Sequence, residues 1–215
     1  MKKILLLFAI LFISVITTAC INNFAIQELN NKAESYMDKG DTDAAICRLK
    51  ASLDLDNEVF QTHYNLAVAY NSIGNYEGAI AESQKVLELK PDFYDAIYLQ
   101  AVAKEAIAYQ VIEQAENPED LSLDEISDFN NKASETVDLF NKYLESKVSA
   151  SETEQINNKI AELNNKIKEY TDIYDSKTEE KNQQLEEEMS NPEENNEAKE
   201  QPSEENVEEN NEPNE

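Results

Sequence analysis

The strongest constraint on the fold is a segment that occurs twice, 34 residues apart. When the stretch 63–91 is shifted back by this step (70 − 36), Tyr70 falls on Tyr36 and Gly74 falls on Gly40. A period of about 34 residues is typical of a unit of two helices joined by a turn. One such unit leaves an apolar face uncovered, so we expect neighbouring units to stack and to bury each other's faces.

The composition favours a helical chain and excludes several classes of function. Three glycines and no Trp leave no room for a glycine-rich phosphate loop, and the most periodic segments have helical spacing. Acidic residues outnumber basic residues 45 to 18, so a phosphate backbone would be repelled. We therefore predict an all-α fold and expect no nucleic-acid partner.

The second copy of the segment resembles the tetratricopeptide repeat. The residues that fill the places of the repeat pattern are Leu66, Ala67, Tyr70, Gly74, Ala79, Leu87 and Pro91. The resemblance implies a short α-solenoid that holds another polypeptide and catalyses no reaction. The residues that it assigns to packing of the repeats are Ala33, Tyr36, Gly40, Ala45, Leu66, Ala67, Tyr70, Gly74, Ala79 and Pro91.

The resemblance also implies a concave groove lined by the first helix of each repeat. The groove residues it assigns are Gln27, Asn30, Glu34, Gln61, Tyr64, Val68, Asn71, Tyr98, Val102 and Glu105, with Met37, Asp38, Ser72 and Asp95 beside them. Tyrosine there offers apolar area and a polar tip, which suits peptide binding. An alternative remains open, in which the long helices of the third unit or the C-terminal helix fill the groove.

The charge of this groove predicts its ligand class. Family members that grip a C-terminal carboxylate use Lys and Asn at groove places, which here hold Asn30, Tyr64, Glu34 and Val68. A net-acidic groove should select neutral or basic peptides.

The first unit, 24–58, and the second, 60–93, are regular, whereas the third departs from the pattern. In the first unit, Asp41, Thr42 or Asp43 can cap the second helix, which should bury an apolar set. That set is Ala45, Ile46, Leu49, Leu53 and Leu55. In the third unit the turn glycine is Ala108, so its first helix should run on to about residue 116. A capping box at 122–125 then starts a long second helix.

A second capping box at 151–154 should begin a C-terminal helix. Its apolar stripe consists of Ile156, Ile160, Leu163, Ile167, Tyr170 and Tyr174, and its polar back includes Lys159. Stacked repeats need a terminal helix that covers the last apolar face, so we interpret this helix as a cap. A dimeric coiled coil is the alternative.

From residue 176 the chain holds 15 Glu against 3 Lys and almost no apolar side chains. Such a segment cannot bury enough surface to offset chain entropy, so we expect a disordered acidic tail, with a frayed helical extension over 178–189 as an option.

The N-terminus resembles a bacterial lipoprotein signal. A short basic start precedes an apolar run, 4–16, that is shorter than a membrane-spanning helix. The following 17–20 stretch resembles a lipobox, although Thr17 stands where Leu is preferred. The resemblance implies cleavage before Cys20 and acylation of Cys20, which would anchor the chain to a membrane outside the cytoplasm. An uncleaved anchor, or an ordinary signal with an incidental Cys, remains an alternative.

We expect no catalytic, cofactor or metal site. Cys47 falls among the apolar positions of a helix, where a lone Cys behaves as a small buried hydrophobe. His63 stands at a packing position with no nucleophile in a recognisable motif. The Asp-rich stretches 41–43 and 54–58 lack the ligand spacing of a calcium loop.

We therefore divide the chain into a signal peptide (1–19), a lipidated N-terminus and linker (20–25), helical repeats (26–148), an amphipathic capping helix (149–175) and an acidic tail (176–215). The leading functional hypothesis is a membrane-anchored scaffold at the bacterial envelope that binds a peptide or protein. The alternative is a structural subunit of an envelope assembly, self-associating through the repeats and the C-terminal helix.

Overall fold

The computed structural model describes residues 22–146 and 148–190. The signal segment, Cys20 and the chain beyond Ser190 lie outside the described residues. Residues 22–37 form the first helix, and the elements that follow are α2 (Thr42–Leu55), α3 (Phe60–Ser72), α4 (Tyr76–Leu89), α5 (Tyr94–Ile112), the 3-10 turn η1 (Pro118–Asp120), α6 (Leu123–Tyr143) and α7 (Ala150–Ser190). In these two ranges there is no strand, which confirms the all-α prediction.

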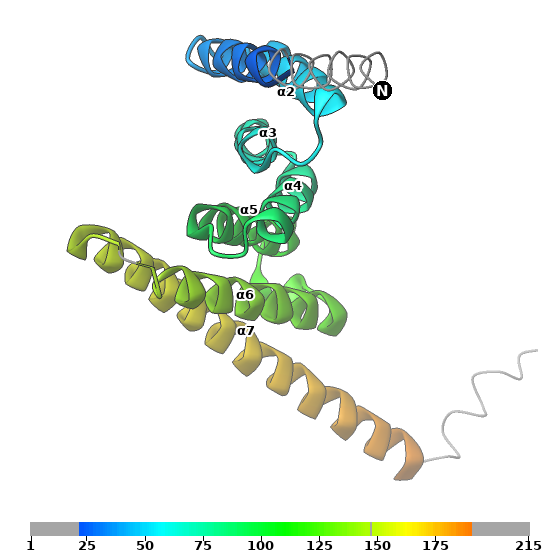
Figure 1. Cartoon of the computed structure of the whole chain (residues 1–215). Coiled ribbons are helices and arrows are strands. Elements are labelled where there is room, and N and C mark those ends of the chain that lie inside the picture. The colour runs from blue at the N-terminus through cyan, green and yellow to red at the C-terminus, as the bar shows by residue number, and fades with distance from the viewer. Residues whose placement is uncertain (1–21, 147, 191–215) are drawn as a thin grey trace, which may run out of the picture. The chain divides into compact units, whose positions relative to one another are not determined.

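The helices from α2 to α6 stack in chain order (Figure 1). Each of them contacts the next, and α3 also contacts α5, so the first helices of successive pairs are neighbours. This is the solenoid arrangement that the 34-residue period predicts.

The turns inside the first two helix pairs have the same backbone hydrogen bonds. The N–H of Asp41 donates to the carbonyl of Tyr36, and 34 residues later Asn75 donates to Tyr70, both at 2.9 Å. These bonds belong to a Schellman motif, which needs a residue with positive φ after the helix. That residue is Gly40 in the first turn and Gly74 in the second, each at φ 76°. Tyr36 and Tyr70 therefore occupy equivalent places in adjacent hairpins.

The residue after each turn glycine caps the second helix. The side chain of Asp41 accepts from the N–H of Ala44 at 3.2 Å, and Asn75 accepts from Gly78 at 3.1 Å. Each cap satisfies a backbone donor that the helix itself cannot pair.

Small and aliphatic side chains form the core between the first two pairs. The buried members are Ala33, Ala45, Ile46, Leu49, Leu66 and Ala69, with Tyr36, Met37, Leu53 and Tyr70 partly buried against them. Ala67 and Ala79 are also buried, whereas Pro91 is exposed.

Two residues of α2 that the sequence predicts to be buried are exposed. Leu55 is 41% exposed because α2 ends there, beyond the face that α3 covers. Cys47 is exposed because the buried positions of α2, which are 45, 46, 49 and 52, share one face of the helix, and position 47 lies on the opposite face.

The third pair is longer, as predicted, although α5 ends at Ile112 and not at about residue 116. Its second helix begins with the expected capping box. Ser122 Oγ accepts from the N–H of Glu125 at 3.2 Å, and the Glu125 carboxylate accepts from the N–H of Ser122 at 2.8 Å. Donation by the Ser122 hydroxyl and N–H lowers the pKa of the Glu125 carboxyl. α6 then buries Ile126, Phe129, Ala133, Thr136, Phe140 and Tyr143.

The N-terminal part of α7 packs against α6. Ile156, Leu163 and Tyr170 are buried, and the Tyr170 ring lies 4.9 Å from the Phe129 ring. The cap differs from the predicted box: Ser149, not Ser151, accepts from the N–H of Glu152, at 3.2 Å. Ser151 lies inside the helix and cannot cap it.

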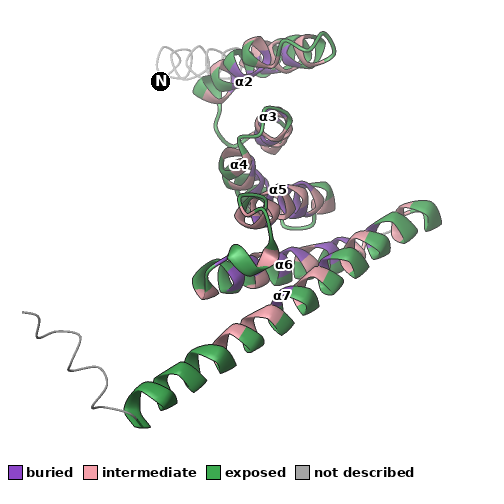
Figure 2. Ribbon diagram, turned by 180° about the vertical axis from the view of Figure 1, so that it is seen from behind, coloured by how far each residue is buried: buried purple, intermediate pink, exposed green. Residues whose placement is uncertain are grey.

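α7 continues to Ser190, past the predicted end of the capping helix at 175 and through the stretch 178–189, where a helical extension is the predicted option. Extending an existing helix costs far less than nucleating one, and Glu, Lys and Gln are good helix formers. A boundary between Ile173 and Tyr174 divides the chain into two compact units. Beyond that boundary α7 becomes wholly exposed towards its end (Figure 2). Among the described helices, none has the length and apolar character needed to span a membrane.

Candidate functional site

The first helices of the repeats border three concavities, which we call the first, second and third concavity. The first has a volume of about 220 Å³ and lies between residues 22–37, α2 and α3. Its lining combines apolar side chains with a carboxylate and an amide, and consists of Ala33, Glu34, Met37, Leu49, Asn65 and Val68. Glu34 and Val68, both predicted groove residues, therefore share one hollow.

The second concavity, of about 400 Å³, lies between α3, the start of α4 and α5. It brings together the predicted groove residues Asn71, Val102 and Glu105. Tyr109 also lines it, although the repeat pattern assigns no groove residue to this position, because a regular repeat has its turn at position 108. Burial, together with the Glu162 carboxylate that accepts from its hydroxyl at 3.2 Å, raises the pKa of Tyr109 to about 12.

The third concavity, of about 410 Å³, contains the predicted residues Tyr64 and Tyr98. Its remaining walls come from Asp95 of α5, Tyr143 at the end of α6, and the start of α7. The α6 and α7 residues carry no sequence signal for the groove, because their place depends on how these helices cross α5.

α7 lies on the groove side of α5, which bears on the alternative of a filled groove. Lys159 donates to both carboxylate oxygens of Glu105, at 2.9 and 2.7 Å. The prediction that Lys159 lies on the polar back of this helix is therefore wrong. The face of α7 that contacts the other helices is wider than its apolar stripe, and it includes Lys159. α7 pairs with Glu105 and Tyr109 of the third pair and lines no part of the first concavity.

Asn30 differs from its predicted groove role. Its amide donates to Ser52 Oγ at 3.0 Å and to Thr62 Oγ1 at 2.9 Å, and its oxygen accepts from Asn65 at 3.1 Å. Ser52 and Thr62 are fully buried, so Asn30 satisfies polar groups between the first helix, α2 and α3. Gln27 and Gln61 are exposed and line none of the three concavities.

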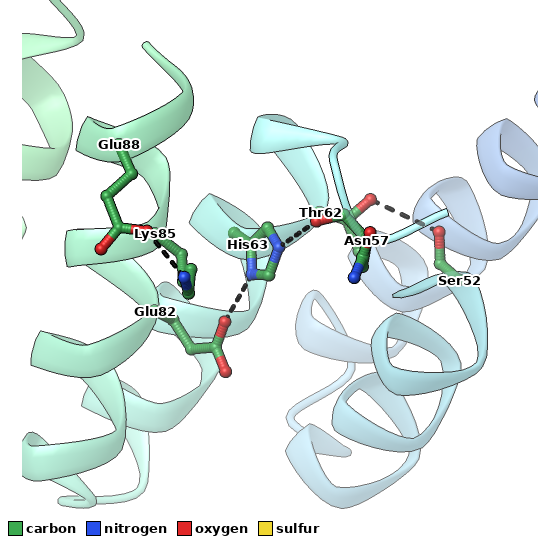
Figure 3. Close-up of polar contacts among 7 residues, drawn as sticks. All are labelled: Ser52, Asn57, Thr62, His63, Glu82, Lys85 and Glu88. Carbon is green, nitrogen blue, oxygen red and sulfur yellow. Dashed lines mark hydrogen bonds and ion pairs between the residues drawn. The ribbon is translucent and has the colours of Figure 1, made fainter. Parts of the chain in front are cut away.

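His63 also makes polar contacts within the fold (Figure 3). Its Nδ1 lies 2.6 Å from a Glu82 oxygen of α4, and its Nε2 lies 2.9 Å from the carbonyl of Asn57 in the inter-repeat turn. The ring therefore links α3 to α4 and to the turn that joins the first two pairs.

Another cavity, of about 640 Å³ and larger than the three concavities, lies away from the predicted groove, between α4, α5 and α6. The ion pair of Lys104 and Glu135, at 2.5 Å, borders it. The described residues contain no cluster of His, Cys, Asp and Glu suited to a metal ion.

Comparison with known proteins identifies the repeated segment. Residues 36–105 match the family model described as tetratricopeptide repeat. No curated protein matches the chain significantly.

Similar solved structures include the complex of the TPR2B domain of yeast Sti1 with pHsp70, at 19% identity and a TM-score of 0.46, covering 65% of this chain and 98% of that one. A crystal structure of MamA shares 19% identity with a TM-score of 0.49, covering 79% and 86%. The second TPR domain of human RPAP3 with an HSP70 peptide shares 12% identity with a TM-score of 0.45, covering 66% and 98%.

Proposed function

Residues 36–105 of this chain are tetratricopeptide repeats, and from this premise we propose that the protein is a non-catalytic module that binds a segment of another protein on the concave side of its repeats. The observation that carries the proposal is the row of three concavities along the first helices. Concave sites that combine apolar or aromatic side chains with polar groups are typical binding sites, and each of the three concavities has both kinds of lining.

The charge of the row supports a neutral or basic partner segment. Each concavity has an acidic side chain in its lining: Glu34 in the first, Glu113 in the second and Asp95 in the third. None of the described residues that line them is Lys or Arg. The nearby cation Lys159 is paired with Glu105. An acidic segment would therefore meet like charge.

Crosslinking in cells from a photoreactive residue at position 34 tests the proposal. Glu34 is exposed and lines the first concavity, whereas Glu77 is an exposed glutamate in the first turn of α4 that lines none of the three. We expect a discrete protein adduct from position 34 and not from position 77. Equal adducts from both positions, or none from position 34, would contradict the proposal.

We also propose that the chain is lipid-anchored through Cys20 and faces outside the cytoplasm of a bacterium. The basic start, the short apolar run and the lipobox-like residues before Cys20 support this. Labelled palmitate should enter the wild type and the Cys47→Ser variant but not the Cys20→Ser variant. Equal labelling of both cysteine variants would refute acylation at Cys20.

Self-assembly through the apolar stripe of α7 is the weaker candidate. Leu163 and Tyr170 are already buried within the chain, and a dimeric seam would have to expose them.

A further inference from the structure

The third concavity is built around three tyrosine rings from three helices. Tyr64 comes from α3, Tyr98 from α5 and Tyr143 from the end of α6. The Tyr98 and Tyr143 ring centroids lie 5.0 Å apart, and an edge contact with Phe93 at 5.1 Å holds Tyr64 in place. Their π faces and edges therefore border one hollow.

Two carboxylates border the same hollow. Asp95 lies one helical turn before Tyr98 on α5, and Glu152 of α7 accepts a hydrogen bond from the Tyr143 hydroxyl. Burial and the Asp95 charge raise the pKa of the Tyr64 phenol, and burial, Glu152 and then Asp95 raise that of Tyr143. The negative potential of Asp95 thus reaches the rings on both sides.

The nearest cation of α7 is already engaged. Lys159 Nζ lies 2.7 Å from Glu105 and sits over the Phe140 ring at 5.8 Å from its centroid. No Lys or Arg is among the described residues that line the hollow, so its two carboxylates lack a basic partner within the lining.

We propose that the third concavity binds a positively charged side chain, arginine or lysine, of the partner segment. This proposal rests on the proposed function and adds a specificity element to it. Aromatic faces attract cations, and the planar guanidinium of arginine can stack on a ring while donating several hydrogen bonds to carboxylates. The Asp95 and Glu152 oxygens are such acceptors. An anionic side chain would be repelled by them, and a neutral side chain would lack the cation–π attraction and the charge that strengthens its hydrogen bonds.

The test compares two peptides on the purified protein by NMR titration of its tyrosine ring resonances. The probe is acetyl-Gly-Ala-Arg-Ala-Gly-amide, and the reference peptide replaces Arg with citrulline, which has nearly the same shape and no charge. We expect the arginine peptide to bind at least about tenfold more tightly, with shifts of the Tyr64 and Tyr98 rings. Equal affinity for both peptides would overturn the proposal.

A matched pair of variants locates the effect. Asp95 is the second residue of α5 and Asp43 is the second residue of α2, and both are exposed. An Asp→Asn change at either position therefore removes one negative charge from the first turn of a helix. We expect D95N to remove most of the preference for arginine and D43N to retain it. Equal preference in both variants would contradict the proposal, as would tighter binding of choline than of the arginine peptide.

The two experiments distinguish a failure of the cation site from a failure of the proposed function. If position 34 captures a partner while the arginine preference is missing, the cation site alone is wrong. If position 34 captures nothing, the proposed function fails.

Discussion

At the scale of single residues, the two turn glycines are the positions where backbone geometry restricts the choice of side chain most. Both have φ 76°, and a Cβ built on either would meet nothing within 4 Å. The cost of substitution is therefore backbone strain alone, without crowding.

We expect Gly74→Ala to lower the free energy of unfolding by about 1 kcal/mol, because an L-residue in the left-handed region is strained. Gly74→Asn should cost less, since Asn tolerates that region. Urea denaturation of the three proteins measures this. Identical midpoints for Ala and wild type would show that the turn relaxes to negative φ.

Tyr109 should make stability sensitive to alkaline pH. Its pKa is raised from 10.0 to about 12, so between these values the folded chain keeps a proton that the unfolded chain has lost. The stabilisation is complete below pH 10 and is lost as pH rises towards 12. Denaturation at about pH 9 and about pH 11 should show a smaller loss of stability for Tyr109→Phe than for wild type.

Glu162→Gln serves as the control for that measurement, because it removes the charge beside the phenol and keeps an acceptor. It should move the Tyr109 titration, followed by tyrosinate absorbance, to lower pH. If the tyrosinate absorbance of both variants titrates as in the wild type, the raised pKa does not belong to Tyr109.

At the scale of elements, the packing of α7 decides between two interpretations of its apolar stripe. In the sequence alone, the apolar stripe from Ile156 to Tyr170 fits either a capping helix or a coiled coil. In the structure Leu163 is fully buried, and Asn130 of α6 donates to the Thr171 hydroxyl at 3.1 Å. The stripe therefore covers the end of the repeat stack.

Leu163→Ala should lower the free energy of unfolding by about 2 to 5 kcal/mol, the range for removing a buried leucine side chain. Hydrogen exchange should locate the loss of protection in α7 and α6. Asn164→Ala changes an exposed neighbour on the same helix and should be nearly neutral. Equal effects of the two changes would argue against capping.

At the scale of the whole molecule, we expect the acidic C-terminal segment to contribute little to the stability of the folded repeats. Residues 179–190 are helical and exposed, and the segment from 176 onward holds 15 Glu against 3 Lys. The described part over 179–190 therefore adds little buried apolar surface to the repeats.

A chain ending at Asp175 should keep the free energy of unfolding within about 0.5 kcal/mol of the full chain, as for changes at exposed surface. A chain ending at Asn165 loses the buried Tyr170 and should be clearly less stable. Denaturant titration of both truncations tests this, and a large loss for the first would mean that the acidic segment stabilises the repeats.

The sequence by itself determined the helix pairs, the glycine turns of the first two pairs and the caps of α2 and α6. A Schellman turn at Gly74 or a capping box at Ser122 joins residues only a few positions apart, so local geometry dictates them. The predicted groove residues Glu34, Val68, Asn71 and Val102 do line concavities, because one helical period repeats one face, and their role in binding stays a prediction.

Only the tertiary structure decided where Asn30 and Lys159 point and which side chains complete the third concavity. Lys159 and Glu105 lie 54 residues apart, and Asn30 meets Thr62 across 32 residues. Contacts at such separations depend on the angle and register at which helices cross. Hydrophobic periodicity identifies the face that is buried, but it leaves that angle and register open.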